Sequence, residues 1–422
     1  MGKKRNKNRF VLLSIVLLVV IFYNITGYSQ SVVDRIYFEG NTKTKSSYLQ
    51  RFIHSKTGEI PDSQKIAEDL RKLSNLAPVM EAKALLTSSG SGLSLIYSIN
   101  ERYTLLPVGD FGISHNNFWI GGGLMESNLG GKGLYAYGYY QYNLRHTVHL
   151  IFRNPYVFAS PWGFEFQLRN TPGIEYDENN IQILNRFFDL GIAVRYEFRY
   201  ENDITAGTSF RRQSAENACF SDGDPIIDLD RSAQVFYLRH ELQKLSCRYF
   251  YVKGWKNRIY FSVQFPYIES NTKIVSMYDE LKIFVRTSRR GNMALRLTAG
   301  ISNEKIKTFY PFLADSYISF RGIGYHAFRG NIIGLINAEY RITCFENPYS
   351  GIQLVAFSDA GYVTRLSYHT IENRARSAQL FPGLGVRFIY KKAYNAILTI
   401  DYGFDVLHRE KGGLVVGWGQ YF

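Results

Sequence analysis

The stretch from Gly163 to Arg169, GFEFQLR, decides the fold class. Its apolar residues Phe164, Phe166 and Leu168 share one face of an extended chain, and its polar residues share the other, because side chains alternate along a β-strand. Strands of a transmembrane β-barrel show this alternation, with apolar residues toward lipid and polar residues toward the lumen. The same pattern recurs at Leu134 to Leu144, Ile192 to Tyr200, Arg258 to Phe265, Met293 to Gly300 and Ala396 to Tyr402.

The composition also favours a membrane barrel. The chain has 32 Tyr, 30 Phe and 36 Gly, and after residue 30 it has no apolar run close to the length of a transmembrane helix. Helical periodicity disappears from Arg102 to Phe422, and about 320 residues then remain for roughly sixteen antiparallel strands with their connections. We therefore expect a mainly β chain with a transmembrane antiparallel β-barrel over residues 104–422. A large secreted β-sandwich or β-helix is the soluble alternative.

The first thirty residues have the layout of a secretory signal peptide. Five Lys and Arg residues precede a 13-residue apolar stretch from Val11 to Tyr23, and small polar residues follow it. The apolar stretch is short for a membrane-spanning helix, so residues 1–30 are predicted to be a cleaved signal, with a retained anchor helix as the alternative. The chain is therefore expected to leave the cytoplasm.

Charge and cysteine content exclude several classes of protein. The net charge is +14, but five of these charges belong to the predicted signal, and after residue 30 basic residues are scattered among acidic ones. That distribution argues against nucleic acid as a partner and fits a barrel with a basic lumen or rim. Only three cysteines are present, Cys219, Cys247 and Cys344, which argues against a disulfide framework.

Residues 31–103 differ from the rest of the chain and predict a small α+β domain. Val32 to Asn41 is expected to form a strand, Thr44 to His54 a helix, and Pro61 to Leu73 a second helix that begins at a proline. Two further strands are predicted at Val79 to Thr87 and at Leu93 to Asn100.

The C-terminal segment reads as a final barrel strand from Leu414 to Phe422. Leu414, Val416, Trp418 and Phe422 are predicted to share its lipid-facing side, although Gln420 interrupts the apolar pattern. An alternating last strand that ends on an aromatic residue resembles the C-terminal recognition strand of many outer-membrane proteins.

Two motifs in the last quarter of the chain resemble the BamA/TamA superfamily. In the segment SFRGIGYHAFRGN, at residues 319–331, Phe320, Arg321 and Gly322 are similar to the Arg-Gly signature of the long sixth loop, which in that family folds back into the lumen. Phe357, Asp359 and Gly361 match the family's Phe-x-Asp-x-Gly pattern on a late strand.

The resemblance implies that Asp359 holds the arginine of the loop. A guanidinium inside a narrow barrel loses hydration and needs a carboxylate partner to remain there. We assign this contact to Arg321, with Arg329 of the second Phe-Arg-Gly as the rival. Five candidate strands follow the loop, as in the sixteen-strand barrel of the family, and the acidic motif lies on the second of them. The alternative is that Arg321 belongs to an ordinary charged turn and that Asp359 is an ordinary lumen carboxylate.

The opening of residues 31–103 carries a further resemblance. Phe38-Glu39-Gly40-Asn41, with Thr44 three residues later, resembles the start of a POTRA domain, the periplasmic repeat of the same superfamily. A POTRA-like domain before a barrel implies an outer-membrane protein whose N-terminal domain lies in the periplasm.

No pattern of catalytic or metal-binding residues appears in the sequence. The eight histidines are dispersed, and Gly-x-Ser-x-Gly and His-Glu-x-x-His motifs are absent. We therefore expect no enzyme activity, no metal and no cofactor.

The resemblance implies a factor that inserts outer-membrane proteins into the lipid bilayer. The first strand, Leu105 to Ser114, would meet the last at a weak seam where a client strand pairs, because Pro107, Gly109 and Gly112 weaken strand pairing. Unfolded outer-membrane or secreted proteins would be the clients, with periplasmic lipoproteins or chaperones as partners. A two-partner-type secretion pore is the first alternative, and a structural barrel without transport activity is the second.

Overall fold

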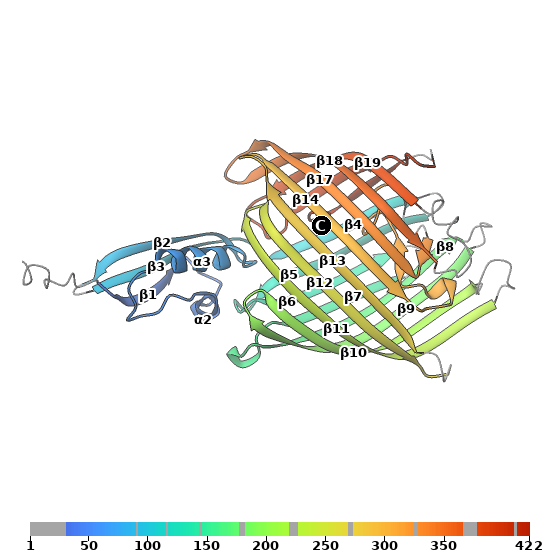
Figure 1. The fold of residues 1–422 in the computed structure, drawn as a ribbon, viewed down its shortest axis with the longest axis horizontal. Helices are drawn as coiled ribbons and strands as arrows, with labels where there is room; N and C mark the ends of the chain where they lie inside the picture. The colour runs from blue at the N-terminus through green and yellow to red at the C-terminus, as the bar shows by residue number, and fades with distance from the viewer. Residues whose placement is uncertain are drawn as a thin grey trace, which may run out of the picture.

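A computed structural model describes residues 31–89, 92–114, 117–142, 146–176, 182–218, 227–268, 273–324, 328–365, 378–408 and 412–422. It has two parts, a small N-terminal domain and a large barrel, which lie end to end along the long axis of the molecule (Figure 1). The predicted signal peptide, residues 1–30, lies outside the described residues. Within them, no helix has the length and apolar character needed to span a bilayer.

The N-terminal domain is a three-stranded sheet with helices on one face. Its elements are β1 (Val33–Glu39), α2 (Ser46–Leu49), the 3-10 turn η1 (Gln50–Phe52), α3 (Ser63–Ser74), β2 (Val79–Ser89) and β3 (Gly92–Glu101). The sheet order is β1-β3-β2, with β1 parallel and β2 antiparallel to the central strand. Leu49, Phe52 and Leu73 from the helical layer pack on Leu95 and Tyr97 of β3 to form the core.

Both predicted helices are shorter than expected. The first was predicted over Thr44 to His54, but its α-helical part is α2 and the chain then tightens into η1. The second begins at Ser63 rather than at the proline, because Asp62 is its N-cap and accepts hydrogen bonds from the N–H groups of Gln64 and Lys65.

The barrel is a sixteen-stranded antiparallel sheet, which confirms the predicted fold class and strand number. Its strands follow one another around the wall in chain order, except that two short strands of an inserted loop are skipped. The sixteen strands are β4 (Leu105–Ser114), β5 (Asn117–Leu129), β6 (Leu134–Tyr142), β7 (His146–Asn154), β8 (Trp162–Tyr176), β9 (Gln182–Arg199), β10 (Asn202–Ala218), β11 (Ile227–Arg248), β12 (Tyr251–Pro266), β13 (Ile274–Arg286), β14 (Gly291–Ser302), β17 (Ile332–Glu346), β18 (Ser350–Thr364), β19 (Ala378–Tyr390), β20 (Ile397–Gly403) and β21 (Gly413–Trp418).

The alternation seen in the sequence separates the two faces of the barrel wall. Phe164 and Ile192 point outward and are exposed, whereas Asp189, between Leu190 and Phe188 on β9, is buried in the lumen. Across the described wall, most outward positions are apolar and many lumen positions are polar or charged, while Leu335 and Phe381 are apolar residues that face the lumen beside the inserted loop. This arrangement is expected of a barrel whose outer face lies in lipid.

A long loop between β14 and β17 folds back into the lumen. It contains the 3-10 turn η3 (Lys307–Phe309) and the short hairpin of β15 (Phe312–Ala314) and β16 (Phe328–Gly330). Phe320 of this loop is fully buried and packs with Phe381 of β19. The loop therefore fills part of the barrel interior.

The barrel is not fully closed by hydrogen bonds. Every pair of neighbouring strands from β4 round to β21 forms a hydrogen-bonded ladder. The first and last strands, β4 and β21, lie next to each other, but the described residues contain no ladder between them. β20 and β21 are also the shortest strands of the wall. We call this line between β4 and β21 the seam.

The N-terminal domain contacts one end of the barrel through the short turns there. The N–H of Lys45 donates to the carbonyl of Gly131 at 2.9 Å, and Arg51 donates to the carbonyl of Ser160 at 2.8 Å. Arg71 of α3 makes two hydrogen bonds of 2.7 Å to the carboxylate of Glu201. The domain is thereby fixed to the end of the barrel that carries these turns.

Candidate functional site

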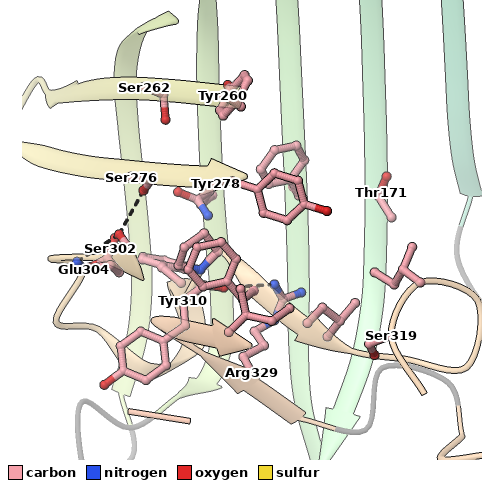
Figure 2. A pocket seen from close by; sticks show the side chains of 18 of the residues that line it. Thr171, Tyr260, Ser262, Ser276, Tyr278, Ser302, Glu304, Tyr310, Ser319 and Arg329 are labelled. Atoms are coloured by element: carbon pink, nitrogen blue, oxygen red, sulfur yellow. Dashed lines mark hydrogen bonds between the residues drawn. The ribbon is translucent and has the colours of Figure 1, made fainter. Parts of the chain in front are cut away.

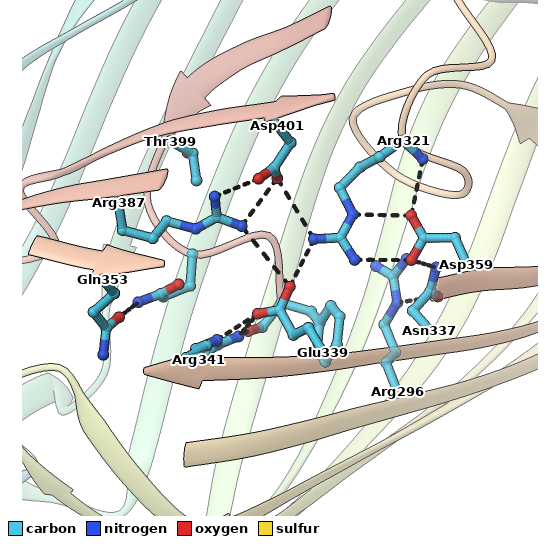
Figure 3. Close-up of polar contacts among 12 residues, drawn as sticks. Arg296, Arg321, Asn337, Glu339, Arg341, Gln353, Asp359, Arg387, Thr399 and Asp401 are labelled. Atoms are coloured by element: carbon cyan, nitrogen blue, oxygen red, sulfur yellow. Dashed lines mark hydrogen bonds and ion pairs between the residues drawn. The ribbon is translucent and has the colours of Figure 1, made fainter. Parts of the chain in front are cut away.

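Arg321 of the long loop makes a bidentate ion pair with Asp359 on β18. Its Nε donates to Oδ2 at 2.9 Å and its Nη2 to Oδ1 at 2.8 Å, and its backbone N–H donates to Oδ2 at 2.9 Å (Figure 3). Both side chains are fully buried. The planar fork of arginine fits a carboxylate in this geometry, so the loop is fixed to the barrel wall at one defined point.

Further carboxylates surround the same guanidinium. Nη1 of Arg321 lies 2.6 Å from Oε2 of Glu339 on β17 and 3.5 Å from Oδ2 of Asp401 on β20. Arg387 on β19 donates to both oxygens of Asp401, at 2.5 and 2.9 Å, and Arg341 is paired with Glu339. We call these residues the arginine cluster: Arg321, Arg341, Arg387, Glu339, Asp359 and Asp401.

The arginine cluster contains three positive and three negative charges. Balance matters here because a buried charge without a partner is far more costly than a paired one. The cluster joins the loop to β17, β18, β19 and β20, which are four of the last five strands before the seam (Figure 3). It therefore links the loop to the side of the wall next to the seam.

Aromatic rings enclose the Arg321 guanidinium on its open sides. The centroid of the Phe357 ring lies 3.6 Å from Cζ of Arg321, and that of the Tyr421 ring lies 4.1 Å away. Asn337 adds a link, since its Nδ2 donates to Oδ1 of Asp359 at 2.9 Å and to the carbonyl of Ser319 at 2.7 Å. Phe357 thus has a direct role in the Phe-x-Asp-x-Gly motif, as one face of the arginine site.

The glycines of the two motifs permit close backbone approach. Gly322 has a φ of +103°, and a Cβ there would lie 2.7 Å from the carbonyl oxygen of Gly403 on β20. Gly361 has a φ of +148°, and a Cβ there would lie 2.1 Å from the carbonyl oxygen of Gly334 on β17. A side chain at either position would push the loop or β18 away from its neighbour.

Sequence reasoning identified one pair of the arginine cluster and missed the rest. Glu339 and Arg341 lie on one face of β17, and Asp401 occupies a lumen position of β20. A charged residue on the lumen face of each strand from β17 to β20 was a usable signal, because the alternation already marked those faces. The sequence did not show that these charges would meet around Arg321.

Arg329, the alternative candidate for the contact with Asp359, lies in another part of the lumen. Arg329 on β16 donates to the carbonyl of Tyr310 at 3.3 Å and lines a lumen cavity of about 670 Å³ between the loop and the wall of β8 to β14 (Figure 2). Figure 2 shows Thr171, Tyr260, Ser262 and Tyr278 on the wall side of this cavity. Basic residues outnumber acidic ones along it: Arg169, Arg186, Arg211, Arg258, Lys282, Arg296 and Arg329 against Glu280 and Glu304.

The prediction for the C-terminal strand is wrong in its last residues. Leu414 and Trp418 are exposed on the outer face, but β21 ends at Trp418 rather than at Phe422. Gly419, with a φ of +86°, turns the chain into the lumen, where Arg341 donates to the main-chain oxygen of Phe422 at 3.1 Å. The Phe422 ring lies 5.2 Å from Arg296, so it contacts lumen arginines instead of lipid.

Comparison with known families agrees with this geometry. The model of the Omp85 superfamily domain matches residues 128–420, which include the loop, the arginine cluster and most of the barrel. The chain belongs to the Omp85 superfamily. The POTRA model, described as a surface antigen variable number repeat, matches residues 31–77. No curated protein matches the sequence.

Solved Omp85-type barrels share the fold at low sequence identity. BamA from Haemophilus ducreyi lacking POTRA domains 1-3 superposes with a TM-score of 0.55 at 13% identity, over 92% of this chain and 84% of that chain. CdiB from Escherichia coli superposes with a TM-score of 0.59 at 11% identity, over 92% of this chain and 76% of that chain. CdiB from Acinetobacter baumannii superposes with a TM-score of 0.55 at 13% identity, over 92% of this chain and 73% of that chain. These likenesses establish the fold of an Omp85 barrel preceded by one POTRA domain.

Proposed function

We propose that this Omp85 protein inserts other β-barrel proteins into the outer membrane by adding client strands at its seam. In this proposal, residues 31–103 form the POTRA domain in the periplasm and residues 104–422 the barrel in the membrane. The single observation that supports it most is the unpaired seam between β4 and β21.

The seam is an energetically weak line in the wall. In lipid, backbone N–H and C=O groups have no water to bond with, so each unpaired group is costly. The unpaired groups at the edge of β4 can be satisfied by pairing with another strand. Pro107 and Gly109 weaken the pairing of β4 within the barrel wall itself. A client strand that pairs with β4 would remove this cost without any cofactor or nucleotide.

The arginine cluster has a supporting role in this proposal. It fixes the loop to β17–β20, so β21 pairs with a rigid wall on one side, whereas no ladder joins it to β4 on the other within the described residues. Opening at the seam would then occur between β4 and β21, because the strands before β21 are held together through the lumen. Arg321 and Asp359 therefore position the seam and do not contact the client.

The POTRA domain offers an edge where clients or partners could pair. β2 is an outer strand of its sheet, and Leu85 and Leu86 on this strand are exposed. Strand addition to β2 would use main-chain hydrogen bonds and these apolar side chains. Unfolded client proteins, periplasmic chaperones or lipoproteins are the partners that fit such an edge.

Depletion of the protein, followed by quantitation of the outer-membrane proteome, tests the proposed function. We expect several unrelated barrel proteins to decrease and to recover with a wild-type copy. A series of copies, each with one cysteine on β4 and one on β21 and with the native cysteines replaced by serine, tests the seam. A copy whose two cysteines form a disulfide should fail to restore the barrel proteins until a reductant opens the disulfide. A matched pair within the paired wall, at Ile192 of β9 and Thr208 of β10, should not block recovery. An unchanged proteome would contradict insertion.

A secretion pore is the second candidate, and the basic lumen cavity favours it. A client chain would pass through the lumen after the loop moved away from Asp359. That function predicts ion conductance in a planar bilayer, which rises when Arg321→Ala releases the loop, and loss of one secreted protein rather than of many barrels. A structural barrel would show neither effect.

A further inference from the structure

The outer face of the barrel has an apolar groove at the end of the seam nearest the POTRA domain. The groove has a volume of about 550 Å³. Its lining includes Tyr103, Leu105, Ser350, Phe388, Leu398 and Trp418. Leu105, Phe388 and Trp418 are each about half exposed, so these side chains face the surroundings of the barrel rather than its lumen.

The groove lies where the last strand ends. β19 reaches Tyr390 and β4 begins at Leu105, but β21 ends at Trp418, where Gly419 turns the chain inward. Leu398 of β20 and Trp418 of β21, which are register partners, therefore line the groove between β19 and β4. An apolar surface of this kind on the outer wall favours contact with lipid chains.

Two lysines without carboxylate partners lie at the rim of the groove. Nζ of Lys43 lies 5.8 Å from the ring centroid of Tyr103, which lines the groove. Nζ of Lys392 lies 4.3 Å from the ring centroid of Tyr349, the residue before Ser350. Neither ammonium group lies within ion-pair distance of a carboxylate in the part of the chain that the structure describes.

The nearby acidic groups are already engaged. Glu346 pairs with Lys391 at 2.7 Å, and the carboxylate of Glu101 accepts backbone N–H groups from Thr42, Lys43 and Thr44. The two rim lysines thus leave positive charge next to an apolar groove. Tyr103 and Tyr390 beside them are residues typical of the membrane interface.

We propose that this groove binds one anionic glycerophospholipid of the periplasmic leaflet. An acyl chain lies against Leu105, Phe388 and Trp418, and the phosphate lies at the rim between Lys43 and Lys392. A lipid with a single negative headgroup is favoured over a zwitterionic one because the second rim charge repels a headgroup ammonium. The site requires that the barrel spans the membrane, and it does not depend on whether the protein inserts clients.

Trp418 provides a direct probe of occupancy, because its ring lines the groove. The full chain is reconstituted in phosphatidylcholine vesicles that contain a minor fraction of phosphatidylglycerol with brominated acyl chains, which quench nearby tryptophans. Subtraction of the emission of Trp418→Phe isolates the Trp418 signal, and Trp162 and Trp255 report ordinary lipid contact elsewhere on the wall. Brominated phosphatidylcholine at the same fraction measures the contribution of unselective lipid.

We expect brominated phosphatidylglycerol to be enriched at Trp418 by about fivefold per lysine relative to the bulk membrane. Lys43→Gln and Lys392→Gln should each lower this enrichment, and the double variant should abolish it. Lys253→Gln on β12, an exposed lysine at the same end of the barrel, should leave it unchanged. Heat-modified gel mobility confirms that each variant is folded.

Two results would overturn the proposal. Equal quenching of Trp418 by brominated phosphatidylglycerol and brominated phosphatidylcholine would mean that only unselective lipid touches the groove. Protection of Trp418 from both lipids would mean that a protein segment covers it. Neither result would bear on client insertion, which the proteome experiment measures separately.

Discussion

Arg321 and Asp359 lie 38 residues apart in the sequence, yet they are joined by three hydrogen bonds in the lumen. One residue belongs to an irregular loop and the other to a wall strand. Their contact therefore determines where the loop sits, and through Glu339 and Asp401 it reaches two further strands.

Asp359→Asn should destabilise the barrel strongly. The change keeps the shape of the side chain but leaves the arginine cluster with an uncompensated positive charge, which costs about 3–5 kcal/mol in a buried site. Urea unfolding in lipid, followed by heat-modified gel mobility, measures the loss. Asp230→Asn is the matched control, since its pair with Arg212 is about half exposed and should contribute less than about 1 kcal/mol. Equal effects of the two changes would contradict a central role for the cluster.

Gly361→Ala should destabilise more than Gly58→Ala. Both glycines have positive φ values, but a Cβ at Gly361 would meet the carbonyl oxygen of Gly334, whereas a Cβ at Gly58 meets nothing within 4 Å. The control therefore carries only the backbone cost of about 1 kcal/mol, and Gly361→Ala adds displacement of β18 from β17. Equilibrium unfolding of both variants separates these contributions. Similar losses would show that β18 adapts to the added methyl group.

The POTRA domain should lose stability in acid through Glu101. Burial acts to raise the pKa of this carboxyl, but hydrogen bonds from Thr44, Lys43 and Thr42 outweigh it and keep the pKa below its ordinary value. A carboxyl with a lowered folded-state pKa adds stability that is complete above its unfolded pKa of about 4.3 and is lost as the pH falls through the folded pKa. Unfolding of the POTRA domain from pH 7 downward should show this loss in wild type.

Glu101→Gln is the variant that tests this assignment. It should be less stable than wild type at pH 7 and should lack the Glu101 part of the decline below about pH 4.3. An acid profile identical to that of wild type would assign the decline to another group.

Glu201→Gln should loosen the contact between the POTRA domain and the barrel. The change replaces the charged acceptor of two 2.7 Å hydrogen bonds from Arg71, each of which contributes about 1.5–3 kcal/mol when one partner is charged. The amides of Lys45 and Cys247 bond across the same interface, so their hydrogen exchange should accelerate. Glu68→Gln removes the more exposed partner of Arg71 and should change exchange much less. Equal acceleration would argue against a special role for Glu201.

The sequence predicted the parts of the fold that depend on local pattern. Period-two alternation indicated the barrel, because lipid and lumen impose opposite preferences on neighbouring residues, and the length of the segment indicated the strand number. The paired motifs predicted that Arg321 and Asp359 would meet. The network beyond them depends on register: Glu339 and Asp401 reach Arg321 only because β17, β18, β19 and β20 are aligned as they are.

The inward turn of the last residues could not be read from alternation. Phe422 fits the outward face when counted along an uninterrupted strand, but the positive φ of Gly419 ends that count. Gly419 and the polar Gln420 were the available signals. The turn places Tyr421 on the Arg321 guanidinium, and the outer groove lies beside Trp418, the last residue before the turn.

The most direct test of the central claim is photo-cross-linking in cells from the edge of β4. A photoreactive residue is placed at Leu105, which is 56% exposed, and in a matched variant at Ile192 on the paired wall, which is 52% exposed. We predict adducts with several newly made outer-membrane barrel proteins from position 105 and none from position 192. The same adducts from both positions, or no barrel proteins at position 105, would contradict strand addition at the seam.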